Sequence, residues 1–133
     1  MKQKVLFLCT GNSARSQMAE AIVNARLADA WEAVSAGTQP AGYVHPLALR
    51  ALAEIGITHQ GRSKAADEYR AVPFDIVVTV CDDAAENCPL WLGQGRRIHL
   101  SFPDPAKATG SEEEILAIFR AVRDDIAQRV PDM

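Results

Sequence analysis

VLFLCTGNSARS, residues 5–16, is an apolar run that ends in a cysteine and passes directly into a short polar loop. The run Val5–Cys9 is short and continuously apolar, which predicts a strand buried on both faces of a parallel sheet. From Ser16 to about Ala30, apolar residues recur at helical spacing. We therefore expect a strand, a tight loop and a helix in immediate succession.

Strand and helix patterns alternate along the rest of the chain. Further strands are predicted at Glu32–Ala36, Phe74–Cys81 and Ile98–Phe102. Further helices are predicted from His45-Pro46 to Gly56, and from an S-x-x-E capping box at Ser111 and Glu114 to Val130. This alternation predicts an α/β fold: a three-layer sandwich with a small, about four-stranded parallel sheet flanked by helices. All 133 residues fit one domain, 1–133.

Composition and charge exclude several classes of protein. Apolar residues make up 48% and charged residues 23%, as in ordinary globular domains. A net charge of −3 argues against a nucleic-acid partner, because such proteins carry a basic excess. No stretch approaches the ~20 apolar residues of a membrane span, and the apolar run at the start is too short for a signal peptide. We expect a cytoplasmic monomer.

The loop that follows the first strand has the composition of an oxyanion site. A tight turn between a strand and a helix directs backbone N–H groups inward, and the helix N-terminus adds its positive dipole end. Gly11 and Asn12 tolerate the positive φ that such a loop needs. Arg15 can clamp two oxygens, and Cys9 at the floor is favoured as a thiolate, with Ser16 as a donor to its sulfur. The expected anion-binding residues are Thr10, Gly11, Asn12, Ser13, Ala14, Arg15 and Ser16.

An ordinary structural explanation exists for the cysteine alone. A cysteine at a strand end is often a small buried apolar residue, and a cysteine six residues before an arginine is a weak signal by itself. The strand before it, the helix after it and the Gly-Asn pair between make coincidence much less probable. The loop is not a nucleotide-binding Walker A motif, because the Gly-Lys-Ser/Thr sequence is missing.

The sequence Cys-Thr-Gly-Asn-Ser-Ala-Arg-Ser resembles the phosphate-binding loop of the low-molecular-weight protein tyrosine phosphatase family. The Cys-x5-Arg-Ser motif is the family's catalytic signature, and Asp104-Pro105 matches its general-acid motif. Length and element order fit the family along the whole chain. The resemblance implies Cys9 as nucleophile, Arg15 as oxyanion clamp and Asp104 as general acid. Cys9, Cys81 and Asp104 each follow a predicted strand, so all three are expected at one edge of the sheet.

The two remaining cysteines, Cys81 and Cys88, indicate which branch of the family is closer. The segment VCDDAAENCP, residues 80–89, resembles the redox segment of thioredoxin-coupled arsenate reductases. A zinc site is not expected, because the histidines are scattered singly. Two inert buried thiols remain an alternative. The polar residues between the cysteines favour an exposed segment in which thiol exchange can occur.

The resemblance implies a cascade of three cysteines. Cys9 attacks arsenate while Arg15 holds the oxyanion and Asp104 protonates the departing oxygen. Cys81 then attacks the Cys9 sulfur, which releases arsenite and forms a Cys9–Cys81 disulfide. Cys88 takes over Cys81, and thioredoxin, or another thiol system, reduces the Cys81–Cys88 disulfide. No cofactor is needed.

The sequence departs from the family pattern at two places. Ala14 occupies a loop position that is cysteine in some of these reductases, but that cysteine lies outside the cascade. Some family members bind potassium beside the loop, and Asn12, Glu20 and Ser63 match the residues that they use. Ala65 stands where an aspartate is expected, which argues against a potassium site here.

Three functions stay open from sequence. The leading hypothesis is an arsenate reductase that detoxifies arsenic. The alternative is a low-molecular-weight phosphatase that hydrolyses phosphomonoesters through a phosphocysteine. The third is a non-catalytic oxyanion sensor, which would need neither Cys9 nor the two further thiols.

Overall fold

The computed structural model of the chain describes residues 2–81 and 95–132. Its strands are β1 (Gln3–Cys9), β2 (Trp31–Gly37), β3 (Ile76–Thr79) and β4 (Arg96–His99). Its α-helices are α1 (Arg15–Arg26), α2 (Pro46–Ala53) and α3 (Glu112–Arg129). Short 3-10 helices are η1 (Ala66–Tyr69), η2 (Pro105–Lys107) and η3 (Val130–Asp132). The predicted relay residue Cys88 lies outside the described residues.

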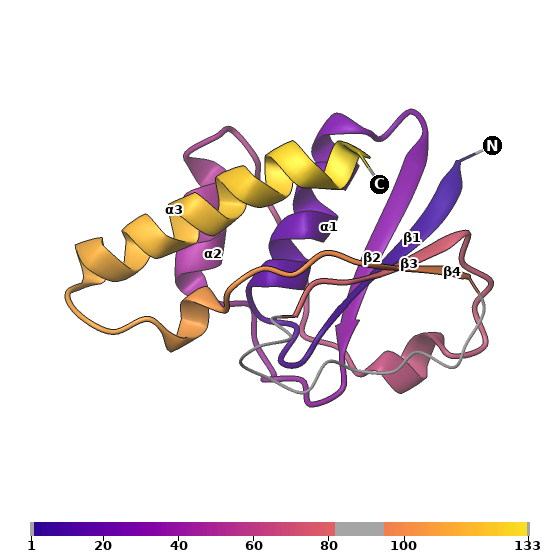
Figure 1. The fold of residues 1–133 in the computed structure, drawn as a ribbon, viewed down its shortest axis with the longest axis horizontal. Coiled ribbons are helices and arrows are strands. Elements are labelled where there is room, and N and C mark those ends of the chain that lie inside the picture. Colours follow the sequence, from indigo (N-terminus) through magenta and orange to yellow (C-terminus); the bar gives the residue numbers. More distant parts are fainter. Residues whose placement is uncertain (1, 82–94, 133) are drawn as a thin grey trace.

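The strands form one parallel sheet in the order β2-β1-β3-β4 (Figure 1). β1 is central, and its residues alternate between the two faces as a strand requires. Val5, Phe7 and Cys9 join the larger hydrophobic core, whereas Leu6 and Leu8 join the smaller one on the other face. This double burial explains the continuous apolar run in the sequence, and the predicted α/β fold with a small parallel sheet is confirmed.

All three α-helices cover the same face of the sheet (Figure 1). They bury their apolar sides in the larger core, to which α3 contributes Leu116, Phe119 and Ile126. Among the described residues, the opposite face is covered by η1, whose Tyr69 packs against Phe74 of the smaller core. β1 and the capped helix α3 have the clearest local signals in the sequence. Both contribute buried side chains to the larger core.

Several element boundaries differ from the sequence prediction. The first helix ends at Arg26 instead of Ala30, because the chain turns back at Leu27 into β2. β3 covers only the centre of the predicted Phe74–Cys81 strand. β4 begins two residues before the predicted Ile98–Phe102 strand and ends at His99, where its register with β3 runs out. Phe102 is fully buried in the core beyond the strand, so its apolar character reflects packing and not pairing.

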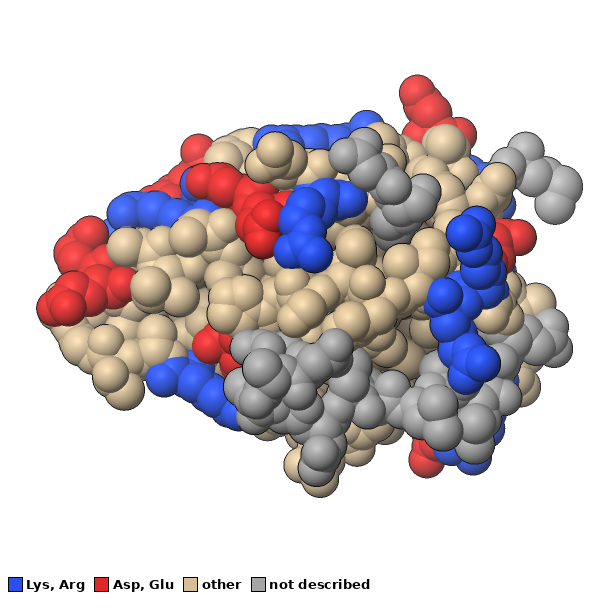
Figure 2. Space-filling model, viewed as in Figure 1, with Lys and Arg blue, Asp and Glu red and all other residues tan. Residues whose placement is uncertain are grey.

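Ser111 caps α3 as the sequence predicts. Its hydroxyl accepts a hydrogen bond from the Glu114 amide at 3.2 Å, and the Glu114 carboxylate accepts one from the Ser111 amide at 3.3 Å. Acidic residues fill the first turn of α3, and Figure 2 shows them as the acidic end of this face, opposite basic side chains over β4.

No helix in the described part of the chain is long and apolar enough to cross a bilayer.

Candidate active site

The loop between β1 and α1 has its carbonyl groups directed outward. The carbonyls of Thr10, Gly11 and Ser13 accept hydrogen bonds from the amides of residues 39, 41 and 45 at 2.8–3.0 Å. The Asn12 carbonyl accepts one from Gln17 Nε2 at 3.1 Å. In a trans peptide the N–H of the next residue points the opposite way, so the amides of residues 11–14 face the interior of the loop. This arrangement has the backbone geometry that the predicted oxyanion cradle requires.

Asn12 is the residue on which the loop turns. It is the one non-glycine residue with positive φ (49°) in the described ranges. Its buried side chain is held by three hydrogen bonds: Nδ2 donates to Ser16 Oγ at 2.8 Å, and Oδ1 accepts from Gln17 Nε2 and from the Lys64 amide. The amide of Asn12 donates to Cys9 Sγ at 3.2 Å. The expected tolerance of positive φ is thus used at Asn12.

Cys9 lies at the floor of this loop and is 2% exposed. Its Sγ atom is 2.8 Å from Ser16 Oγ. Because that oxygen already accepts a hydrogen bond from Asn12, its own hydrogen is available to the sulfur. Two donors, an amide and a hydroxyl, therefore converge on the Cys9 sulfur.

The N-terminus of α1 opens into the same loop. The cap residue is Ala14, which has no side-chain acceptor, and the first turn contains no acidic residue. A cap residue without a side-chain acceptor and a first turn without acidic residues leave the positive dipole end of α1 suited to an external anion. An Asp or Ser cap would satisfy an amide of this turn internally and would compete with the ligand.

Arg15 and Asp104 meet at the mouth of the loop. The Arg15 guanidinium is 3% exposed, donates through Nη1 to the Phe102 carbonyl at 3.3 Å and lies 3.5 Å from Asp104 Oδ2. Asp104 Oδ1 accepts a hydrogen bond from the Ala106 amide and so caps η2. The structure therefore brings the candidate clamp and the candidate general acid together from distant parts of the sequence.

Cys81 follows β3 and is fully buried. β3 pairs directly with β1, and the Val80 amide donates to the Leu8 carbonyl at 2.8 Å. Cys9 and Cys81 thus lie just beyond hydrogen-bonded neighbours at the carboxyl ends of adjacent parallel strands. Cys9 is a free thiol, whereas Cys81 is disulfide-bonded.

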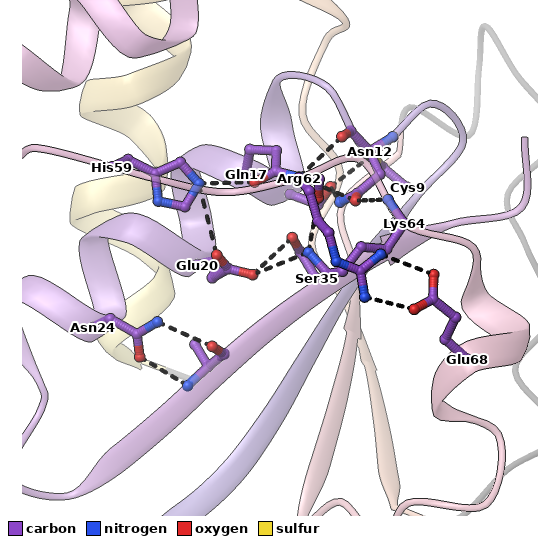
Figure 3. A network of polar contacts seen from close by, with 12 residues as sticks. Cys9, Asn12, Gln17, Glu20, Asn24, Ser35, His59, Arg62, Lys64 and Glu68 are labelled. Atoms are coloured by element: carbon purple, nitrogen blue, oxygen red, sulfur yellow. Dashed lines mark hydrogen bonds and ion pairs between the residues drawn. The ribbon is translucent and has the colours of Figure 1, made fainter. Parts of the chain in front are cut away.

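A buried polar network beneath the loop was missed by sequence reasoning (Figure 3). Gln17 and Glu20 point from α1 toward the segment 59–64, where Gln17 Oε1 contacts His59 Nε2 at 2.8 Å and Gln17 Nε2 donates to the Arg62 carbonyl at 2.8 Å. Glu20 accepts a hydrogen bond from Ser35 Oγ at 3.0 Å. One signal was available: polar residues interrupt the apolar side of α1 at positions 17 and 20.

The residues present do not fit a potassium ion. The oxygens that would ligate it are engaged with protein donors: Asn12 Oδ1 with two N–H groups, and Glu20 Oε1 with Ser35. The Lys64 ammonium lies 3.7 Å from Glu20 Oε1. Residue 65 is alanine and offers no side-chain ligand. In the described part of the chain, no group of three or more His, Cys, Asp or Glu side chains forms a metal site.

Comparison with known proteins agrees with this geometry. Residues 4–133 match the model of the family described as low molecular weight phosphotyrosine protein phosphatase. The chain belongs to this family. The resemblance inferred from the Cys-x5-Arg-Ser loop is thereby confirmed.

Several proteins to which this chain is similar are arsenate reductases. The arsenate reductase of Halalkalibacterium halodurans is 45% identical over 130 residues, which span 97% of this chain and 93% of that protein. The crystal structure of arsenate reductase from Archaeoglobus fulgidus has a TM-score of 0.70 and 32% identity, and covers 96% of this chain and 98% of its own. A structure of an arsenate reductase in the phosphate binding state has a TM-score of 0.74 and 28% identity. The match covers 98% of this chain and 95% of that chain.

Proposed function

We propose that this protein reduces arsenate to arsenite through Cys9, Cys81 and Cys88. The observation that carries the proposal is the position of two thiols, Cys9 and Cys81, at the carboxyl ends of the adjacent strands β1 and β3. The first thiol lies inside an oxyanion cradle and the second lies next to it in the sheet. Similarity to arsenate reductases along nearly the whole chain supports the same function.

The first step joins sulfur to arsenic. The amides of residues 11–14 and the Arg15 guanidinium bind the oxyanion, and the Cys9 thiolate attacks arsenic. A hydroxyl group of the arsenate leaves as water after taking a proton from Asp104. Arsenic is still As(V) in this adduct, so no electrons have been transferred.

The second step is the reduction. The Cys81 thiolate attacks the Cys9 sulfur, and the electron pair of the S–As bond goes to arsenic, which leaves as arsenite, As(III). The two thiols become a Cys9–Cys81 disulfide, which accounts for the two electrons. Adjacent strand ends suit this step, because the attacking sulfur must reach the sulfur that is attacked.

The last step restores Cys9. The Cys88 thiolate attacks Cys81, Cys9 leaves as a thiolate, and a Cys81–Cys88 disulfide remains for an external dithiol, which we propose to be thioredoxin. In this structure Cys81 is disulfide-bonded, whereas Cys9 is a free thiol. The protein would work as a cytoplasmic monomer without a bound cofactor.

Hydrolysis of phosphomonoesters is the second candidate function. The same cradle, the Arg15 clamp and Asp104 suit a phosphoryl group, and the matching family model is named for phosphotyrosine phosphatases. In this reaction water resolves a phosphocysteine, and no second thiol takes part. The paired strand ends at Cys9 and Cys81 would then have no chemical role, which favours the reductase.

One paired assay tests the proposal. Oxidation of NADPH is followed with thioredoxin, thioredoxin reductase and arsenate, beside hydrolysis of p-nitrophenyl phosphate by the same preparation. We expect NADPH oxidation that depends on arsenate and is lost in Cys9→Ser, with only weak phosphatase activity. Glutaredoxin, glutathione and glutathione reductase replace thioredoxin and its reductase in a further arm to identify the reductant. Fast p-nitrophenyl phosphate hydrolysis without arsenate-dependent oxidation in either arm would favour the phosphatase.

A further inference from the structure

A carboxylate and an ammonium group are buried side by side beneath the oxyanion loop (Figure 3). Glu20 on α1 is 9% exposed, and Lys64, which precedes η1, is 6% exposed. Lys64 Nζ lies 3.7 Å from Glu20 Oε1 and donates a hydrogen bond to the Arg62 carbonyl at 2.9 Å. Burial of a single charge is costly unless an opposite charge accompanies it, so each of these groups depends on the other.

His59 is the other basic group beside this carboxylate, with Nε2 at 3.6 Å from Glu20 Oε2. Burial lowers the pKa of His59 below its usual value; Glu20 opposes this shift, and the positive charge of Lys64 adds to it. Its Nε2 atom lies closer to Gln17 Oε1, at 2.8 Å, than to Glu20. Among the described residues, the geometry therefore assigns Lys64 to Glu20 as its cation.

The backbone of the same lysine holds the loop. Its amide donates to Asn12 Oδ1 at 2.8 Å, and its carbonyl accepts from the Gly37 amide at 2.8 Å. Gly61 permits the close approach of this segment to α1, because a Cβ there would collide with the His59 ring and with Gln17 Oε1. The ion pair thus fastens the segment that fixes Asn12 in its positive-φ conformation.

We propose that Lys64 is a tethered cation that positions the oxyanion loop, because its ammonium group takes the place beside Glu20 that a free monovalent cation would otherwise fill. A potassium ion and an ammonium group carry the same charge and have similar radii. Because the ammonium group is covalently attached, no dissolved cation is needed. The same residue carries the charge beside Glu20 and the amide that bonds Asn12. The proposal concerns anion binding by the loop and does not depend on which reaction the loop performs.

The experiment removes the tether and supplies the cation from solution. Lys64→Ala, the wild type and Arg62→Ala are compared at pH 8, above the ordinary pKa of a histidine side chain of about 6.5. Arg62 is the matched control: its exposed guanidinium pairs with Glu68 on the same segment, and an exposed pair contributes little. Thermal unfolding and the Kd of inorganic phosphate, added as its choline salt, are measured in choline chloride and in KCl or NH4Cl at constant ionic strength.

In choline we expect Lys64→Ala to unfold roughly 10 °C lower than the wild type, because one partner of a buried pair is lost. Phosphate should bind about tenfold more weakly, a change of ~1.4 kcal/mol. KCl or NH4Cl should restore most of both losses in Lys64→Ala. For the wild type and Arg62→Ala, the unfolding temperature and the Kd of phosphate should be the same in KCl or NH4Cl as in choline chloride.

A double variant keeps the proposal testable if Lys64→Ala does not fold in choline. Lys64→Ala/Glu20→Gln removes both charges, so it should be folded, more stable than the single variant and indifferent to potassium. The proposal is overturned if Lys64→Ala keeps the wild-type unfolding temperature and phosphate affinity in choline. It is equally overturned if potassium does not restore the single variant, or if the double variant is as unstable as the single one.

Discussion

Nη2 of Arg15 lies 3.5 Å from Oδ2 of Asp104, and both side chains are largely shielded from solvent, with 3% and 19% of their surface exposed. The other oxygen of Asp104, Oδ1, is already engaged by the Ala106 amide at 3.0 Å. The carboxylate is therefore fixed at one oxygen and presents the other to the guanidinium at the start of α1. This geometry makes Asp104 the cap of η2 and also suits the proton donor that we propose it to be.

Substitution at Asp104 separates these roles. Asparagine keeps an acceptor for the Ala106 amide but carries no acidic proton, whereas alanine loses both functions. We expect Asp104→Asn and Asp104→Ala to reduce kcat by a similar factor, about 10²–10⁴, because the lost proton transfer dominates. Steady-state kinetics and thermal unfolding of both variants provide the measurement. Near-wild-type kcat in Asp104→Asn would show that this residue only caps η2.

The substitution Arg15→Lys tests whether the planar guanidinium group is needed at this position. The guanidinium contacts the Phe102 carbonyl and Asp104 through separate nitrogens, and a lysine ammonium cannot hold both contacts and an anion in one plane. We expect kcat/KM for the oxyanion to fall by about 10²-fold or more, with the charge unchanged. Phosphate binding by calorimetry checks the same loss without turnover. Unaltered phosphate affinity would mean that charge alone is sufficient at this position.

The strand-loop-helix unit at the site was predictable because its signals are local. The apolar run of β1, the Gly-Asn pair and the arginine lie within twelve consecutive positions, and the structure shows the strand, a positive φ at Asn12 and a helix that starts at Arg15. β4 was misplaced because Arg96 and Arg97 are exposed on an edge strand and carry no apolar signal. The strand is fixed by its register with β3, which a linear pattern does not contain.

The network of Gln17, Glu20, His59 and Lys64 could not be predicted from spacing. Its partners lie on α1 and on the segment before η1, and their meeting depends on how the chain returns after α2. The potassium-binding pattern of the family concerns positions 63 and 65. The positive charge beside Glu20 comes instead from Lys64, which lies between them. Ser63 instead bonds the loop itself, donating to the Gly11 carbonyl at 3.1 Å.

His59 makes the stability of the fold depend on pH. Its pKa is lowered in the folded protein chiefly by burial, so the unfolded chain binds the proton more readily. The stabilisation is complete above the ordinary pKa of about 6.5 and is lost as pH falls from there through the lower folded value. His45, whose pKa burial also lowers, adds a loss in the same direction.

His59→Gln isolates this contribution, since a glutamine amide can still donate to Gln17 without titrating. Between pH 7 and pH 5 we expect the free energy of unfolding to fall less steeply in the variant, by at most about 1.4 kcal/mol per pH unit for one proton. Urea unfolding at half-unit pH intervals gives the slopes. Identical slopes for the variant and the wild type would assign the pH dependence to other groups.

Variants of Cys81 and Cys88 distinguish the two candidate reactions within one protein. Hydrolysis of a phosphocysteine needs Cys9, Arg15 and Asp104 but no second thiol, whereas arsenate reduction needs two electrons from a resolving thiol. Cys81→Ser should therefore lose arsenate reduction and retain weak p-nitrophenyl phosphate hydrolysis. Because Cys81 is fully buried, thermal unfolding of this conservative variant serves as the control for its fold.

Cys88→Ser should stop one step later. Cys81 can still attack the Cys9 sulfur, so we expect about one arsenite per enzyme molecule and then arrest as a Cys9–Cys81 disulfide. That bond joins two cysteines that are 2% and 0% exposed, and thioredoxin cannot reach buried sulfur atoms. Peptide mapping by mass spectrometry under non-reducing conditions identifies the link, and arsenite is counted in a single-turnover experiment. Repeated turnover of Cys88→Ser with thioredoxin would show that Cys88 takes no part in the relay.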